Sequence, residues 1–115
     1  MNDEDCISVI EEVFEFCCTI ERRVSKYDIT EASIAVDPDH ADLILMPLCQ
    51  IGESVQNARA NLETRYPEVP WHRMAGLRNV IVHGYTKVDP SIIYSTVIVD
   101  IPKLKAFCQE VLGYR

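Results

Sequence analysis

An arginine, a histidine and a tyrosine stand close together in the second half of the sequence, at Arg78, His83 and Tyr85. A guanidinium keeps its charge and donates two parallel hydrogen bonds to phosphate oxygens. An imidazole titrates near neutral pH, so it can take a proton from a ribose 2′-hydroxyl or return one to a leaving 5′-oxygen. Residue types of this kind suit the metal-independent cleavage of RNA, since DNA lacks the attacking hydroxyl.

The three residues fall at the end of a predicted helix that begins near Pro70 and that Gly84 is placed to end. In a regular helix Arg78 and His83 lie about 140° apart, so they flank a groove, and Asn79 shares the face of His83. The apolar side of this helix is Trp71, Met74, Leu77, Ile81 and Val82. Arginine and histidine are also common as helix caps, and the eight-residue pattern alone leaves both interpretations open.

The rest of the chain predicts further helices around this one. Residues 3–27 and 38–66 carry apolar side chains at steps of three and four, and Asp37-Pro38 is typical of a helix start. Pro47 removes a backbone donor inside the second of these helices and predicts a kink. Residues 28–36 suit either a short strand or a loop.

The last third of the chain also favours helices. Residues 91–101 are rich in β-branched side chains, which favour a strand locally, but a single strand would have no partner, so we expect a helix. Residues 102–112 repeat apolar side chains at helical spacing. The sequence therefore predicts one all-α domain over residues 1–115, a bundle of four or five helices.

Charge and cysteine content exclude several classes of protein. Net charge is −7, with fourteen acids and four bases in residues 1–64 but four bases and one acid in residues 65–88. The basic island suits one local phosphate or a plain solvated face, and the acidic body disfavours non-specific binding to nucleic acid. The five cysteines include no CxxC pair, which predicts no disulfide and a cytoplasmic location. The three histidines are scattered, and no Cys/His spacing typical of a metal site occurs, so we expect none. No apolar stretch is long enough for a membrane span.

Three separate blocks resemble the HepT family of HEPN-domain proteins. They are Leu48–Glu53, Arg65–Trp71 and Met74–Tyr85, and the likeness extends over about residues 43–112. The resemblance implies a HEPN-type helical bundle that acts as a homodimer, with the two Arg-x4-His motifs meeting at the dimer interface. It also implies a metal-independent endoribonuclease, the toxin of a two-gene toxin–antitoxin module, that needs no cofactor for RNA cleavage.

The resemblance assigns roles to individual residues. Arg78 and His83 correspond to the catalytic pair, and Asn79 to a residue that helps to orient them. Tyr85 corresponds to the tyrosine to which the partner antitoxin, a minimal nucleotidyltransferase, transfers AMP from ATP. An adenylylated tyrosine places phosphate charge beside the cations meant for RNA, which occupies and neutralises the site.

Other charged residues are weaker candidates. Glu53 supports Arg78 from the preceding helix or is a plain solvated glutamate, and Arg73 and Lys87 are candidates for RNA backbone contacts or isolated surface cations. A different class of function also fits the strong acidity and the lack of a broad basic groove. On that alternative the chain is a non-catalytic helical module that docks onto a nucleotidyltransferase.

Overall fold

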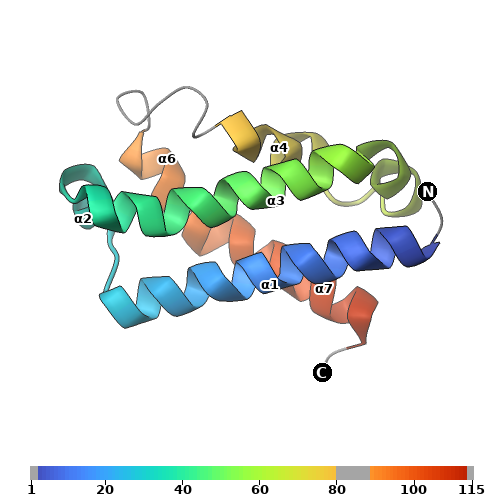
Figure 1. Cartoon of the computed structure of the whole chain (residues 1–115), viewed down its shortest axis with the longest axis horizontal. Helices are drawn as coiled ribbons and strands as arrows, with labels where there is room; N and C mark the ends of the chain where they lie inside the picture. The colour runs from blue at the N-terminus through green and yellow to red at the C-terminus, as the bar shows by residue number, and fades with distance from the viewer. Residues whose placement is uncertain (1–2, 80–88, 114–115) are drawn as a thin grey trace.

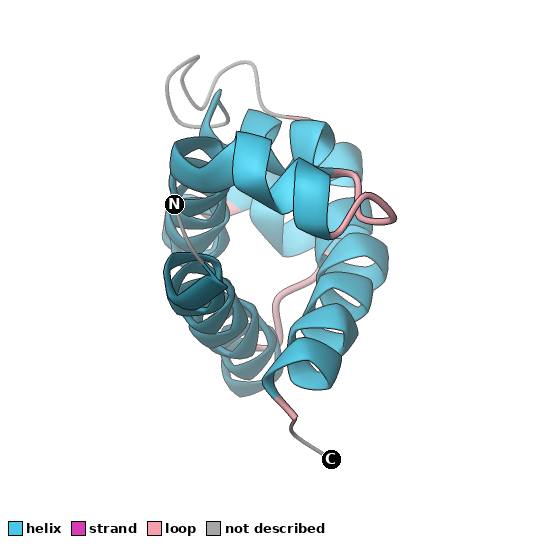
Figure 2. Cartoon of the chain, turned by 90° about the vertical axis from the view of Figure 1, so that its right-hand side faces the viewer, coloured by secondary structure: helices cyan, strands magenta, loops and turns pink. Residues whose placement is uncertain are grey.

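The computed structural model describes residues 3–79 and 89–113, and every regular element in these ranges is helical (Figures 1 and 2). The predicted all-α bundle is confirmed. In chain order the elements are α1 (Asp3–Tyr27), α2 (Glu31–Val36), α3 (Pro38–Arg65), α4 (Trp71–Ala75), η1 (Gly76–Arg78), α6 (Pro90–Ser95), η3 (Thr96–Asp100) and α7 (Ile101–Leu112).

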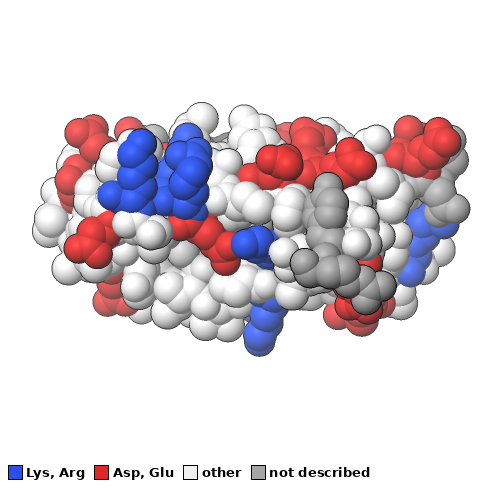
Figure 3. Space-filling model, turned by 90° about the horizontal axis from the view of Figure 1, so that it is seen from below, with Lys and Arg blue, Asp and Glu red and all other residues white. Residues whose placement is uncertain are grey.

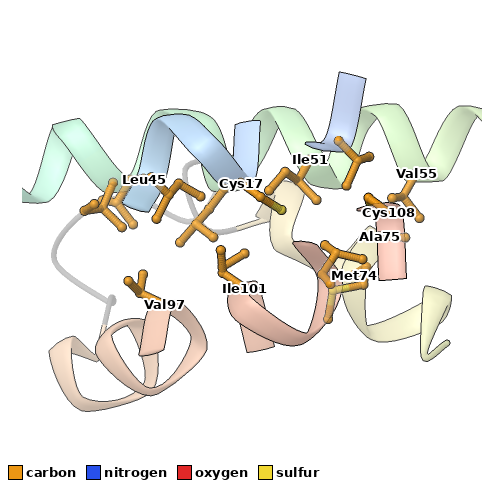
Figure 4. Close-up of a cluster of buried hydrophobic side chains, with 14 of the residues drawn as sticks. Cys17, Leu45, Ile51, Val55, Met74, Ala75, Val97, Ile101 and Cys108 are labelled. Carbon is orange, nitrogen blue, oxygen red and sulfur yellow. The ribbon is translucent and has the colours of Figure 1, made fainter. Parts of the chain in front are cut away.

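Three long helices form the frame of the bundle. α1 and α3 lie side by side and run in opposite directions, and they share the most extensive contact of any two elements, followed by α1 and α7 (Figure 1). Side chains of α3 point toward those of η3 and α7 in the core (Figure 4). The fully buried aliphatic side chains of this frame include Ile10, Ile20, Ile44, Leu45, Leu48, Ile51, Val55, Leu62 and Ile101.

Capping side chains set the boundary between α2 and α3. The Thr30 hydroxyl accepts a hydrogen bond from the Ser33 amide, and the Ser33 hydroxyl accepts one from the Thr30 amide, which forms a capping box. The Asp37 carboxylate then accepts the amides of Asp39 and His40 at the start of α3. The helix start at Asp37-Pro38 is confirmed, whereas the strand or loop predicted for residues 28–36 is wrong, because most of this segment forms α2.

The β-branched segment from residue 91 is helical, as predicted, and it contains an irregular turn. The Ile101 amide donates to the Thr96 carbonyl five residues back, and this π-helical turn, η3, joins α6 to α7. Pro102 has no amide hydrogen, so the regular ladder is interrupted at this point. The Thr96 hydroxyl donates to the Ile92 carbonyl at 2.9 Å, which supplies another local bond.

α3 continues through Pro47 as one helix, and the kink predicted there stays a prediction. Two apolar side chains of the predicted helix stripes are exposed. Tyr27, in the last residue of α1, and Met46, on the outer side of α3, are 42% and 48% exposed. Within residues 3–79 and 89–113 no helix combines the length and the apolar character that a membrane crossing requires.

All five cysteines are free thiols in the structure. Cys17 of α1 and Cys108 of α7 are buried in the frame, and burial raises the pKa of both thiols, that of Cys108 to about 12. Outside the core, Lys105 of α7 donates to Glu21 of α1 at 2.7 Å, and this hydrogen bond raises the pKa of the Lys105 amine. Hydrophobic packing and one ion pair therefore join the first and last helices.

Candidate functional site

The segment that carries Arg78 begins at a firmly held tryptophan. Chain direction changes over residues 67–70, and the Trp71 indole Nε1 donates to the Tyr66 carbonyl at 2.9 Å. The Trp71 ring is buried and meets the edge of Phe107 of α7 at a centroid distance of 5.6 Å. Trp71 and Met74 are both core residues, as predicted, so the start of α4 is fixed against α7.

A salt bridge joins α4 to the π-helical turn. Arg73 Nη2 lies 2.6 Å from Asp100 Oδ2, and the Arg73 side chain is 63% exposed while that of Asp100 is only 13% exposed. The guanidinium that was a candidate for RNA contact is therefore engaged with a carboxylate. The role of Arg73 in RNA binding stays a prediction.

The helix changes character before it reaches Arg78. α4 ends at Ala75, and Gly76–Arg78 form the 3₁₀ turn η1. The regular helix predicted through this segment is wrong at this point, because a 3₁₀ turn advances about 120° per residue and not 100°. The angle predicted between Arg78 and His83 falls outside the residues that the structure describes and stays a prediction.

The backbone of Arg78 lies directly on α3. A Cβ atom added to Gly52 would lie 2.2 Å from the Arg78 nitrogen and 2.9 Å from its Cα atom, so only a glycine permits this approach. One turn earlier on α3, Cys49 Sγ donates to the Arg78 carbonyl oxygen at 3.4 Å. We call Cys49, Gly52 and Arg78 the α3–η1 contact.

The side chains around this contact differ in exposure. Arg78 is half-buried, whereas Asn79 and Glu53 are exposed. Glu53 lies one turn beyond Cys49 on α3, and burial together with the Glu53 charge raises the pKa of the Cys49 thiol. No ion pair joins Glu53 to Arg78 among the described residues. The supporting roles predicted for Glu53 and Asn79 stay predictions.

Other predicted site residues lie outside the part of the chain that the structure describes. These are His83, Tyr85 and Lys87.

Among the described residues, no group of three or more His, Cys, Asp or Glu side chains is arranged to hold a metal ion. A groove of about 600 Å³ between the start of α4 and α7 is lined mainly by apolar side chains, and Arg78 is not among its lining residues.

Sequence reasoning found Arg78 but missed the two residues on which it lies. Gly52 and Cys49 precede Arg78 by more than twenty positions, and neither carries chemistry that the Arg-x4-His pattern requires. Two signals were available: a glycine inside a helical stripe often marks the close approach of another backbone, and both residues belong to the Leu48–Glu53 block that carries the family resemblance. The partner of that approach is not visible in one sequence.

Residues 4–111 match the family described as Ribonuclease HepT-like, and the chain belongs to that family. This match covers nearly the whole helical bundle, including the α3–η1 contact. The resemblance to HepT-like proteins is thereby confirmed. No solved structure matches the chain.

Three relatives carry names of the same kind. "Putative RNase TTE0752" of Caldanaerobacter subterraneus is 29% identical over 90% of this chain and 90% of its own length. "Probable ribonuclease HepT" of Thermococcus cleftensis and "Putative RNase MJ1380" of Methanocaldococcus jannaschii are 40% and 36% identical over 48% of this chain. These two alignments span half of each relative's length.

Proposed function

We propose that this chain is a metal-independent endoribonuclease, the toxin of a toxin–antitoxin module. The observation that carries the proposal is the family match, which spans the whole Arg78–Tyr85 stretch. The names of the relatives support action on RNA. The firm attachment of Arg78 to α3 supports a fixed role for its guanidinium.

In the proposed reaction the ribose 2′-oxygen attacks the adjacent phosphorus. The 2′-hydroxyl loses a proton and the leaving 5′-oxygen gains one, with His83 as the base or the acid and solvent water exchanging the other proton, so the bond from phosphorus to the 5′-oxygen breaks as the bond to the 2′-oxygen forms. Arg78 stabilises the charge that develops on the non-bridging oxygens. The products are a 2′,3′-cyclic phosphate and a 5′-hydroxyl. In the homodimer two copies of the motif face one RNA strand.

The partner in this proposal is a nucleotidyltransferase antitoxin that uses ATP as AMP donor. AMP on Tyr85 places phosphate charge two residues from His83, where it competes with RNA for the same cations. Incubation with the partner, ATP and magnesium should raise the mass of the Tyr85 peptide by one or more AMP units. Equal modification of a Tyr85→Phe variant would show that the target is another residue.

The catalytic test uses purified protein without its partner, in EDTA. Wild-type protein should cleave RNA, while Arg78→Ala and His83→Ala should lose turnover but keep the helical circular dichroism spectrum and cooperative unfolding. Product analysis should find cyclic phosphate ends. Unchanged cleavage by both folded variants would exclude the proposed mechanism.

A non-catalytic module that docks a nucleotidyltransferase is the second candidate. The surface favours it, because on the face shown in Figure 3 the described acidic side chains are spread from end to end and the Lys and Arg side chains lie in small separate groups. Such a charge pattern gives little general attraction for RNA. A stable complex with the partner, formed by a protein that never turns over RNA when free, would favour this candidate.

A further inference from the structure

We infer that Gly52 and Cys49 are positioning residues, which hold the backbone of Arg78 so that its guanidinium points at the RNA phosphate. This inference rests on the proposed ribonuclease function and deepens it, since it concerns how the cation of that site is placed. Both residues belong to α3, whereas Arg78 ends the short turn η1.

Gly52 permits the nitrogen end of Arg78 to lie close to α3. A Cβ atom at position 52 would stand 2.2 Å from the Arg78 nitrogen, 2.9 Å from its Cα and 3.0 Å from its Cβ. Unbonded carbon atoms normally pack at about 3.5–4.0 Å, so a methyl group there would displace the Arg78 backbone by about 1 Å. The obstructing atoms are main-chain atoms, which cannot rotate away as the tip of a side chain can.

Cys49 fixes the carbonyl end of the same residue. Its Sγ atom donates to the Arg78 carbonyl oxygen at 3.4 Å. Because the pKa of this thiol is raised above its ordinary value of 9.0, the sulfur keeps its proton at neutral pH and remains a donor. With its nitrogen packed against Gly52 and its carbonyl hydrogen-bonded to Cys49, the main chain of Arg78 lies against α3, and we expect this contact to set the direction of its Cα–Cβ bond.

Gly52→Ala tests the nitrogen end of the contact, and Gly76→Ala is its matched control. Among the described residues, and apart from its chain neighbours and the backbone of its own helix, a Cβ atom at Gly76 has no atom within 4 Å, although this residue lies only two positions before Arg78. A misplacement of about 1 Å is expected to cost about 100-fold in kcat for RNA cleavage, with KM changed by less than about threefold. Gly76→Ala should keep the wild-type kcat. Wild-type kcat in a folded Gly52→Ala variant would overturn the inference.

A double variant separates positioning from general damage to the fold. If Gly52 acts through Arg78, adding Gly52→Ala to Arg78→Ala should cause no further loss of turnover. A second full loss on top of that of Arg78→Ala would show that Gly52 acts elsewhere in the molecule, and the inference would fail.

Cys49→Ala removes the donor without adding bulk, so it decides the matter where Gly52→Ala does not fold. We expect kcat to fall about fivefold, the usual effect of losing one hydrogen bond, with unfolding still cooperative. Wild-type kcat in this variant would overturn the inference. If Arg78→Ala retained full activity, the proposed function would fail. If cleavage depended on Arg78 but was unchanged in the Cys49 and Gly52 variants, only the positioning inference would fail.

Discussion

The two sides of α3 have different structural roles. Toward α1 the helix presents large aliphatic side chains that are fully buried, and these form the frame of the bundle. Toward η1 it presents a glycine and a thiol, which contact main-chain atoms of Arg78. The first side buries apolar area and so stabilises the fold, whereas the second contributes little area and sets the position of one residue. Substitutions on the two sides should therefore separate stability from activity.

The largest effect is expected from Ile20→Ala in the frame. Ile20 of α1 is completely buried, and removing its three outer carbons leaves a cavity in a close-packed region. The free energy of unfolding should fall by about 2–5 kcal/mol, as measured by urea denaturation. RNA turnover per folded molecule should stay at the wild-type value. Ile20→Val is the matched control, with a loss of about 0.5–1.5 kcal/mol.

A large loss of turnover in the folded Ile20→Ala protein would contradict the division between the frame and the α3–η1 contact. That result would mean that packing of the frame also sets the position of Arg78. The opposite pattern is expected of Gly52→Ala. Relative to Ile20→Ala, this variant should lose more RNA turnover and less free energy of unfolding.

Sequence periodicity was sufficient to predict the frame. Apolar side chains at steps of three and four specified α1 and α3, because burial of one face dominates the energetics of long helices. α2 was missed because six residues are too few to show a helical period, while Ile29, Ile34 and Val36 favour a strand locally. The capping box of Thr30 and Ser33 is a local signal that decides the conformation there.

The site was predictable only in its chemistry. Arg78 was found because a permanent cation near a histidine suits a phosphodiester, and the side-chain types alone carry that information. The 3₁₀ turn at Gly76–Arg78 and the support from Cys49 depend on the approach of a second helix. Such a contact joins segments that are far apart in sequence, so local propensity has no information about it.

A second, smaller effect compares a thiol of the frame with the thiol of the α3–η1 contact. Cys108 belongs to the frame, and its pKa is raised from 9.0 to about 12 by burial, so the native thiol keeps its proton at a pH where the unfolded chain has lost it. Its contribution to stability is therefore complete below pH 9 and is lost as the pH rises toward about 12. The expected slope is about 1.4 kcal/mol per pH unit for this thiol.

The measurement is urea denaturation at pH 8 and at pH 10.5 for wild type, Cys108→Ala and Cys49→Ala. Cys108→Ala should be less stable than wild type at pH 8, and its stability should fall less steeply as the pH rises. Cys49, half-buried at the α3–η1 contact, is the comparison, and its removal should change the slope less. Equal slopes in wild type and Cys108→Ala would show that Cys108 does not stay protonated in the native state.

The smallest effect concerns Arg73, whose salt bridge joins α4 to Asp100 of η3. Its salt bridge with Asp100 has one exposed partner, so solvent and salt screen it, and Arg73→Ala should cost about 0.2–1 kcal/mol of stability. Asp100→Asn should cost a similar amount, and the double variant no more than either alone. Because Arg73 is engaged with a carboxylate, its loss should weaken RNA binding no more than Lys103→Ala, a change at an exposed cation of α7. Filter binding at two salt concentrations decides this, since a clear fall in affinity and in salt dependence for Arg73→Ala alone would assign Arg73 to the RNA surface.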